Sequence, residues 1–230
     1  MKITWLGHSG FRIEIGDQIL LVDPWMTGNP MFPEDSRETA IKGATAIVLT
    51  HGHGDHVGDT IAVAKELNIP VLGIYDLMSH FEKTEGIAVT GFNKGGTVKL
   101  GTVAITMVNA VHSSSMHGPN GPVYCGSEAG YMIAGDGHTI YVSGDTDVMA
   151  DMKIFNDLHK PDIGILCSGG HFTMDMKRAS YAAKTFFNFA AVIPCHYRTF
   201  PLLEQSAALM KEELQGVNVI EPQVMVPITM

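Results

Sequence analysis

The sequence AIVLTHGHGDH, at residues 46–56, decides how the rest of the chain is interpreted. Its first four residues form a short apolar run that is typical of a buried strand. The run leads directly into His51, His53, Asp55 and His56, which form the pattern H-x-H-x-D-H. Imidazole and carboxylate groups are ligands that zinc, iron and manganese accept in proteins. The stretch therefore predicts a metal site in a loop at the end of a strand, rather than a polar loop whose histidines cap backbone groups.

The spacing inside this motif indicates more than one metal ion. The two glycines of the motif let the backbone turn tightly. His51 and His53 are two residues apart, so they can point to one side of the loop. Asp55 and His56 are adjacent, and we expect them to point elsewhere, toward a second metal.

Three further candidates follow predicted strands elsewhere in the chain. His112, Asp145 and His196 come shortly after the apolar runs at 103–108, 139–143 and 191–193. Polar residues just past the end of a buried strand are where α/β folds place active sites. Each residue alone is a weak signal, because a lone histidine in such a place is more often structural than a ligand.

Apolar patterns along the chain predict a mixed α/β protein. We expect strands at 3–6, 11–15, 18–22, 46–49, 71–74, 98–100, 103–108, 129–134, 139–143, 163–167 and 191–193. We expect helices at 59–67, with Asp59 as the cap, and at 76–83, 148–158, 179–189 and 202–214. Asp136-Gly137 is a hairpin turn signal, and the proline-containing segment 23–43 is interpreted as a surface loop.

Composition limits the class of protein. The chain has 230 residues, of which 45% are hydrophobic and 17% charged, so it can bury a sizeable core. No linker or charge block divides it, which favours a single domain over residues 1–230. The net charge of −9 disfavours a nucleic-acid partner. The three cysteines form no short pairing motif, which favours a reducing compartment. No leader sequence and no long apolar run are visible, so we expect a cytoplasmic protein without a membrane span.

The ordered series of candidate ligands resembles the metallo-β-lactamase superfamily. The resemblance covers nearly the whole chain, and it implies an α/β (α+β) fold, a four-layer αββα sandwich with the metal site at one edge. A narrower resemblance is to small metal-dependent hydrolases related to L-ascorbate-6-phosphate lactonase and N-acylphosphatidylethanolamine phospholipase D. The segments that carry it are WLGHSGF at 5–11, GHFTMD at 170–175, and His196-Tyr197 followed by TFP at 199–201.

The resemblance implies a role for each candidate ligand. It implies that His51, His53 and His112 bind a first metal ion, that Asp55, His56 and His196 bind a second, and that Asp145 bridges the two. The expected cofactors are therefore two divalent metal ions. Zinc is the first candidate, and manganese and iron are alternatives because all three suit histidine and aspartate ligands.

The expected activity is hydrolysis of a small-molecule ester or lactone, free or phosphorylated. Two divalent ions can share one water and convert it to hydroxide, which attacks the substrate. Besides the ligand Asp55, we consider His8 and His171 as catalytic residues, with a purely structural histidine as the alternative for each. Arg198, Tyr197 and Asp175 are candidate substrate contacts, although Arg198 equally suits a solvated surface position.

Two other functions stay open at this point. The first is a phosphodiesterase or nuclease on the same scaffold, although relatives of that kind usually carry an inserted domain or arm for which this chain has no room. The second is a metal-binding protein without catalysis, which the complete ligand series disfavours. The expected partner is a small-molecule substrate; a homo-oligomer is compatible with the sequence, but no feature indicates one.

Overall fold

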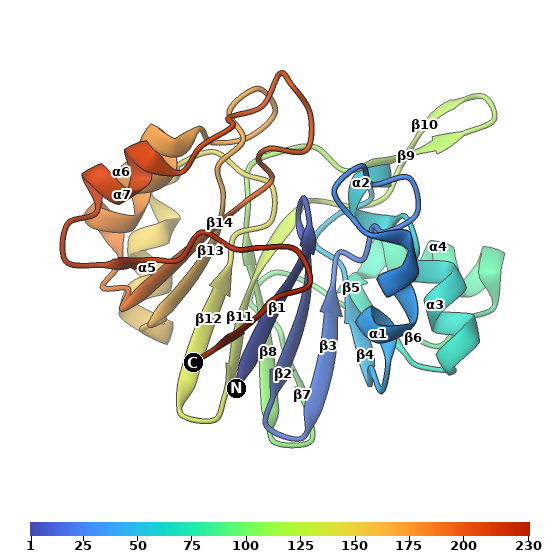
Figure 1. Cartoon of the computed structure of the whole chain (residues 1–230). Coiled ribbons are helices and arrows are strands. Elements are labelled where there is room, and N and C mark those ends of the chain that lie inside the picture. Colours follow the sequence, from blue (N-terminus) through green and yellow to red (C-terminus); the bar gives the residue numbers. More distant parts are fainter.

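Two seven-stranded β-sheets lie face to face in the computed structural model, which describes residues 1–230. Helices cover the outer face of each sheet, so the chain forms four layers in the order α, β, β, α (Figure 1). The predicted αββα sandwich is confirmed. No helix combines the length and the apolar character that a bilayer-crossing segment needs.

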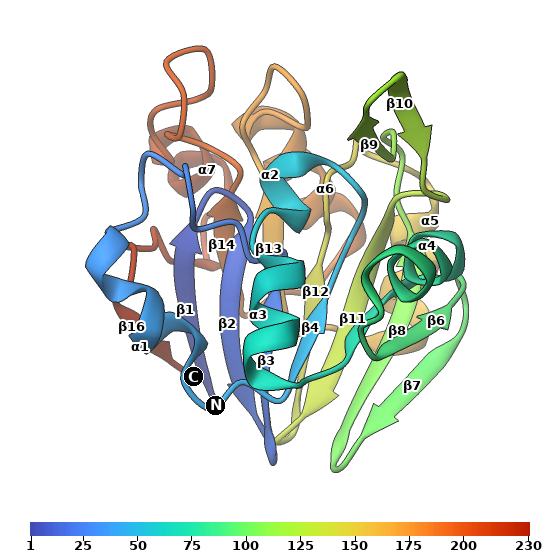
Figure 2. The ribbon, with the colours of Figure 1, turned by 90° about the vertical axis from the view of Figure 1, so that its right-hand side faces the viewer.

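The first sheet comes mainly from the N-terminal half of the chain. Its strands are β1 (Lys2–Gly7), β2 (Gly10–Ile15), β3 (Gln18–Val22), β4 (Ala46–Val48), β5 (Val71–Ile74), β6 (Val89–Phe92) and the C-terminal β16 (Pro227–Thr229). Their spatial order is β16-β1-β2-β3-β4-β5-β6. The helices of this half are α1 (Arg37–Ile41), α2 (Gly54–Val57), α3 (Thr60–Leu67) and α4 (Tyr75–Glu85). Figure 2 views the molecule from the side that they cover.

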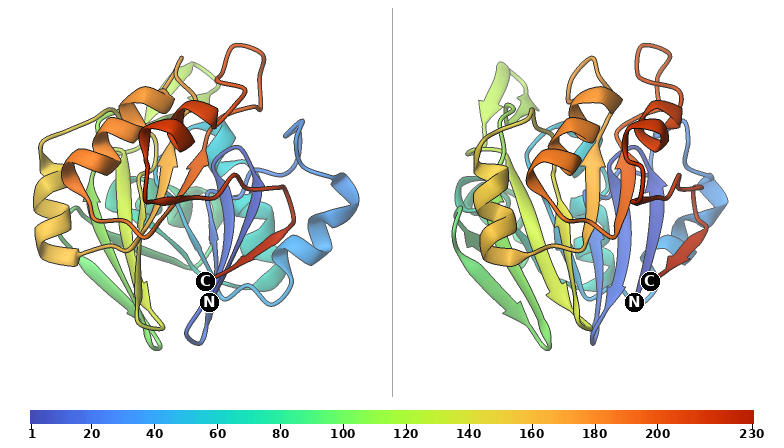
Figure 3. Two further views of the ribbon diagram at one scale, coloured as in Figure 1. Left: turned by 60° about the vertical axis from the view of Figure 1, so that its left-hand side comes forward. Right: turned by 90° about the vertical axis from the view of Figure 1, so that its left-hand side faces the viewer.

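The second sheet comes from the C-terminal half. Its strands are β7 (Thr97–Leu100), β8 (Val103–Asn109), β11 (Ala129–Gly135), β12 (His138–Val142), β13 (Ile163–Cys167), β14 (Ala191–Cys195) and β15 (Asn218–Val219). Their spatial order is β15-β14-β13-β12-β11-β8-β7. The helices α5 (Asp151–His159), α6 (Met176–Phe186) and α7 (Ala208–Glu213) cover its outer face (Figure 3).

Strand direction places several strand ends at one edge of the sandwich. In the first sheet, β3 to β6 run parallel, and in the second sheet β12 to β15 do the same. The carboxyl ends of β3, β4, β12 and β14 lie at the upper edge in Figure 1. Parallel strands need long return connections, so the loops that leave this edge are free to carry functional side chains.

One apolar cluster of 60 buried residues joins the two sheets to each other and to the helices that cover them. The central strands β4, β5, β13 and β14 are buried along their whole length, as expected for parallel strands covered on both faces. At the site edge, the ring of Trp5 stacks on that of Tyr197 with 5.7 Å between centroids. A well-packed core of this kind gives the loops above it a fixed base.

The segment 23–43 differs from its prediction as a surface loop. It contains a 3₁₀ turn at Glu34–Ser36 and the helix α1, and the side chains of Met26 and Phe32 are buried. The Asp59 carboxylate holds the segment down, because it accepts hydrogen bonds from the backbone N–H of Met26 at 2.6 Å and of Thr27 at 2.8 Å. Asp59 precedes α3 as predicted, but its side chain makes no capping hydrogen bond to that helix.

Other elements also differ from the prediction, and α2, β6, β15 and β16 have no counterpart in it. The helix expected over 202–214 begins only at Ala208, in α7. The segment 115–124 forms a hairpin of β9 (Ser115–Gly118) and β10 (Gly121–Tyr124) that pairs with neither large sheet. Figure 2 shows this hairpin standing above the edge that carries the strand ends.

Candidate metal centre

The structure brings all seven predicted ligands together at the upper edge of the sandwich. They come from the loop after β4, from α2, and from the segments that follow β8, β12 and β14. Their donor atoms form clusters in which all atoms lie within 4.8 Å of one another. The clusters are His51 with His53 and His112, His51 with His56 and Asp145, and Asp55 with His56, His196 and the additional residue His8.

Asp145 is the centre of this arrangement. Its Oδ2 atom lies 3.1 Å from Nε2 of His196, 3.3 Å from Nε2 of His56, 3.6 Å from Nε2 of His112 and 4.0 Å from Nε2 of His51. Burial opposes its charge, but His196 and His56 outweigh burial and hold the pKa of this carboxyl well below its usual range. A buried carboxylate among four imidazoles is therefore ready to accept a cation.

The first group of ligands is only partly buried. Nε2 of His51 lies 3.0 Å from Nδ1 of His53, so the two rings direct nitrogen atoms toward the same space. His51 is buried, and its other nitrogen lies 3.0 Å from the Thr50 hydroxyl. Burial, followed by repulsion from His56, lowers the pKa of His51 well below the usual value, which keeps the ring neutral as metal binding requires. His53 and His112 are half-buried.

The second group is more deeply buried and is supported by an acidic residue behind it. Nδ1 of His56 donates to Oδ2 of Asp23 at 2.8 Å, so Nε2 is left to face Asp145. Asp23 also accepts from the backbone N–H of Thr50 at 2.8 Å and from the Thr50 hydroxyl at 2.6 Å. Burial opposes protonation of His56, but Asp145 and Asp23 outweigh it and raise its pKa well above the usual value. A cation that binds at Nε2 of His56 would replace the proton on that nitrogen.

Asp23 was not among the predicted site residues, although the sequence contains the signal. It directly follows the buried strand β3, just as the predicted ligands follow theirs. It is hydrogen-bonded to the candidate ligand His56, and a carboxylate in such a contact usually orients a metal-ligating histidine.

His8 lies beside Asp55 in the interior. Its Nε2 atom is 3.0 Å from Oδ2 of Asp55, and its Nδ1 atom is 2.8 Å from the hydroxyl of Thr199. Its exposed fraction is 1%, and burial is the main cause that lowers its pKa to about 4. Both ring nitrogens therefore have protein partners, and neither is directed at solvent.

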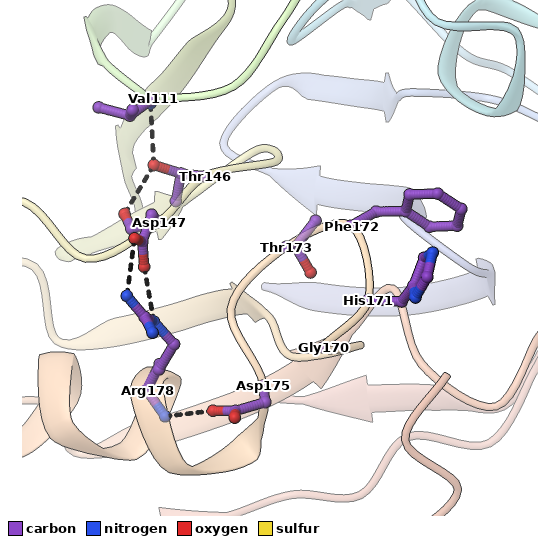
Figure 4. A pocket seen from close by; sticks show the side chains of 9 residues that line it. All are labelled: Val111, Thr146, Asp147, Gly170, His171, Phe172, Thr173, Asp175 and Arg178. Atoms are coloured by element: carbon purple, nitrogen blue, oxygen red, sulfur yellow. Dashed lines mark hydrogen bonds and ion pairs between the residues drawn. The ribbon is translucent and has the colours of Figure 1, made fainter. Parts of the chain in front are cut away.

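His171 lies in a different environment, on the exposed loop between β13 and α6. It lines a cavity of about 380 Å³ together with its neighbour Phe172 (Figure 4). Val111 and Thr146 belong to the same cavity, and they are the chain neighbours of the ligands His112 and Asp145. None of the seven candidate ligands lines this cavity itself, and His171 is an exposed imidazole on its wall. His53 and Asp55 line a different cavity of about 220 Å³, together with residues of the β9–β10 hairpin.

The remaining wall of this cavity carries paired charges. Nε and Nη2 of Arg178 each lie 2.8 Å from a different carboxylate oxygen of Asp147, which makes a two-pronged ion pair. Asp175, a predicted substrate contact, caps α6 by accepting from the backbone N–H of Arg178 at 2.7 Å. Asp175 therefore lines the cavity, but one of its two carboxylate oxygens is occupied by this hydrogen bond.

The other two predicted substrate contacts are directed away from the cluster. Tyr197 is fully buried against Trp5, so its ring lies in the core below the site. The exposed side chain of Arg198 extends toward the C-terminal segment, where Nη1 lies 4.0 Å from Oε1 of Glu221. His196 lies just past the end of β14 with a φ of 56°, so the chain turns here, and Tyr197 packs into the core instead of joining His196.

Comparison with known proteins places the chain in a family. The profile of the beta-lactamase superfamily domain matches residues 18–220. The chain belongs to the beta-lactamase superfamily. It is 67% identical over 225 residues to a "UPF0173 metal-dependent hydrolase" of Dinoroseobacter shibae, with 98% of each chain covered. A protein of the same name from Paracoccus denitrificans is 65% identical over 228 residues, with 99% of each covered.

Solved structures share the fold of this superfamily member. Igni18, described as a metallo hydrolase from Ignicoccus hospitalis, superposes with a TM-score of 0.86 at 29% identity, covering 100% of this chain and 98% of its own. The metallo-beta-lactamase fold protein YhfI of Bacillus subtilis has a TM-score of 0.75 at 18% identity, with 99% of each chain covered. The predicted superfamily is confirmed; the narrower resemblance to lactonase and phospholipase D stays a prediction.

The superfamily implies metal, and the residues present fit it. Nε2 of His56 and Oδ1 of Asp145 are buried and have no hydrogen-bond partner in the protein. Buried polar atoms are normally satisfied, so each unpartnered atom needs an explanation, and a bound cation is one. Imidazoles and carboxylates in this number and proximity are a donor set for zinc, manganese or iron.

Proposed function

We propose that this chain is a binuclear metal-dependent hydrolase of a small-molecule ester or lactone, free or phosphorylated. The observation that carries the proposal is Oδ2 of Asp145, which lies within 4.0 Å of Nε2 of four different histidines. One buried carboxylate oxygen placed between two groups of imidazoles suits a ligand shared by two cations. Zinc is the first candidate metal, followed by manganese and iron.

The residues divide into two sets. His51, His53 and His112 would hold one ion, Asp55, His56 and His196 the other, and Asp145 would contact both. Ions in such a pair supply an activated water at neutral pH and polarise the substrate oxygen that gains negative charge. The protein supplies ligand orientation: Asp23 and Thr50 fix the rings of His56 and His51 through hydrogen bonds to their Nδ1 atoms.

The leaving group needs a proton, and the exposed wall of the cavity offers a donor. His171 is exposed, and the cavity that it lines borders the segments of His112 and Asp145. An exposed imidazole on a cavity wall can act as a general acid toward a departing oxygen. We therefore assign His171 as the candidate proton donor, because His8 is buried with both nitrogens engaged.

The cavity favours a small substrate of low negative charge. Its volume of about 380 Å³ suits a small molecule. Asp147 and Asp175 line it together with Arg178, whose guanidinium is already paired with Asp147. Such a wall attracts a polyanion poorly, and so does a chain with a net charge of −9. This is why the ester or lactone is preferred to a nucleic-acid substrate.

The test combines metal content with a substrate panel. The protein is reconstituted with zinc or manganese, its metal is counted by elemental analysis, and turnover of a nitrophenyl ester, a lactone and a bis-nitrophenyl phosphodiester is measured. Asp145→Ala serves as the control, since residual turnover there would be contamination.

Two ions per chain with ester or lactone turnover that Asp145→Ala abolishes would support the proposal. Turnover of the phosphodiester alone would replace the substrate class with the phosphodiesterase alternative. A reconstituted protein that binds no metal would overturn the function altogether.

A further inference from the structure

The second ligand group has a hydrogen-bonded chain behind it that the proposed function leaves without a role. Thr199 contacts His8 at 2.8 Å, and His8 contacts Asp55 at 3.0 Å. Thr199 is 191 residues away from His8 in sequence, yet both side chains are buried at the same point. A role of these three residues toward a metal ion rests on the proposed function.

The geometry fixes which nitrogen of His8 carries a proton. Nε2 faces a carboxylate oxygen of Asp55, and two lone pairs at that distance would repel, so Nε2 carries the hydrogen. Nδ1 of the neutral ring is then an acceptor for the Thr199 hydroxyl. The other two neighbours of that hydroxyl, Sδ of Met31 and the carbonyl of Tyr197, lie farther away, at 3.3 Å each. Thr199 thus favours the tautomer that donates to Asp55.

The receiving oxygen is the one that faces the second metal group. Oδ2 of Asp55 lies 3.8 Å from Nε2 of His196 and 4.0 Å from Nε2 of His56. A hydrogen bond to this atom restricts rotation of the carboxylate and holds the oxygen toward the two histidines. The Asp55 side chain keeps 32% of its surface exposed, so without His8 it would have freedom to turn toward water.

The backbone and the surrounding rings hold His8 in place. Its φ of 52° lies in the left-handed region, which costs energy for a histidine unless other contacts compensate. Its carbonyl accepts from the indole N–H of Trp5 at 2.8 Å and from the backbone N–H of His196 at 2.9 Å. The ring lies against that of His196, with 3.9 Å between centroids, and edge-on to Trp25 at 5.3 Å.

We infer that His8 and Thr199 are positioning residues for the second metal ion: Thr199 orients His8, and His8 holds Oδ2 of Asp55 in its ligating position. His8 is neither a ligand nor a proton donor to the substrate in this assignment. Removing a hydrogen-bond partner of a metal ligand typically weakens the affinity for the metal by about 10–100-fold. The effect is specific to the second site, because no hydrogen bond or ion pair joins these three residues to His51, His53 or His112.

The experiment measures the affinity of each metal site in the full chain by competition with a chromophoric chelator. The disrupting variants are His8→Ala and Thr199→Val. The restoring variants are His8→Gln, whose amide N–H reaches about as far from the backbone as Nε2, and Thr199→Ser, which keeps the hydroxyl. Thr60→Val is the matched control, because Thr60 is buried in α3 and its hydroxyl has no partner.

We expect the disrupting variants to weaken the second site by about 10–100-fold while the first site keeps its affinity. The restoring variants and Thr60→Val should bind as wild type does, and thermal melting identifies any variant that fails to fold. X-ray absorption adds a second readout, the average number of imidazoles per ion, which should be the same in wild type and His8→Gln.

Two results would overturn the inference while leaving the hydrolase intact. One is an unchanged second site in folded His8→Ala and Thr199→Val. The other is loss of one imidazole and of the second ion in His8→Gln, because His8 would then be a ligand. A wild-type chain that binds no ion would be a different failure, since it overturns the proposed function on which the inference rests.

Discussion

The two halves of the candidate metal centre are built from the same residue types but differ in burial and support. In the first half, only His51 is fully buried, while His53 and His112 are half-buried. In the second half, His56 and His196 are both buried, Asp23 holds His56 from behind, and His8 holds Asp55. The first half is therefore the more open of the two, because two of its three histidines are half-buried, whereas in the second half only Asp55 is, with 32% of its side chain exposed.

This difference in burial and support suggests that the two halves hold their ions with different strength. Buried ligands with their own hydrogen-bond partners lose little entropy on binding a cation, because their rings are already oriented. Half-buried ligands must be ordered by the cation itself. We expect the second half to keep its ion under conditions that strip the first.

The largest loss should follow Asp145→Ala, because this side chain belongs to both halves. Its Oδ2 atom lies near histidines of each group, so its removal should empty both sites and abolish hydrolysis. Elemental analysis and turnover on the same sample check this. Wild-type metal content with surviving activity would contradict the shared role of Asp145 and the comparison that depends on it.

The clustering of the candidate ligands at one edge could be predicted from the sequence because most of them follow buried strands. An apolar run fixes the position of a strand end, and the polar residue after it must lie at that edge of the sheet. His51 after β4 and Asp145 after β12 follow this rule. Asp23 after β3 follows it too, and it could have been predicted by applying the same rule to every strand.

Contacts between distant segments could not be predicted in this way. The buried position of segment 23–43 depends on the Asp59 carboxylate, which lies 33 residues beyond Met26 in sequence. The contact of Thr199 with His8 joins the two ends of the chain. The hairpin β9–β10 pairs only with itself, and its strands lack a clear apolar alternation because much of it is exposed. None of these features has a local periodicity that indicates it.

A pair of single-ligand variants compares the two halves directly. His53→Ala should lose the first ion and little stability, because His53 is half-buried. His56→Ala should lose the second ion and also leave the buried Asp23 carboxylate without one of its donors, which costs about 1–3 kcal/mol. Metal counting and denaturant unfolding of the metal-free proteins separate the two effects. An equal loss of unfolding free energy in both variants would contradict the difference in hydrogen-bond support between the two halves.

A smaller loss should follow Asp23→Asn, which changes the support and leaves every ligand in place. Asp23 has a φ of 44°, a conformation that asparagine tolerates well. The amide offers one acceptor oxygen where the carboxylate offers two, so it cannot accept from both the backbone N–H of Thr50 and the N–H of His56, and the orienting hydrogen bond is neutral and weaker or is lost. We expect the second site to weaken by about 10–100-fold and the first to stay unchanged.

Competition titration with a chelator, read for each site, checks this expectation. Asp59→Asn is a suitable control, since Asp59 is also a buried aspartate that accepts backbone hydrogen bonds but serves segment 23–43. A first site that weakens as much as the second in Asp23→Asn would mean that Asp23 supports the whole edge and not one half.

His171→Ala should remove no metal at all, and this is what separates the cavity wall from both halves of the metal centre. His171 is exposed and has no hydrogen bond to any ligand, so both ions should stay bound. If it donates the proton to the leaving group, kcat should fall by about 100-fold or more with little change in KM. A substrate with a leaving group that needs no proton should be turned over almost as fast as by wild type, whereas a merely structural role would slow both substrates equally.

His80→Ala, on the outer helix α4, provides the matched control. Loss of an ion from His171→Ala would instead make His171 a ligand, and the cavity wall would then belong to the metal centre.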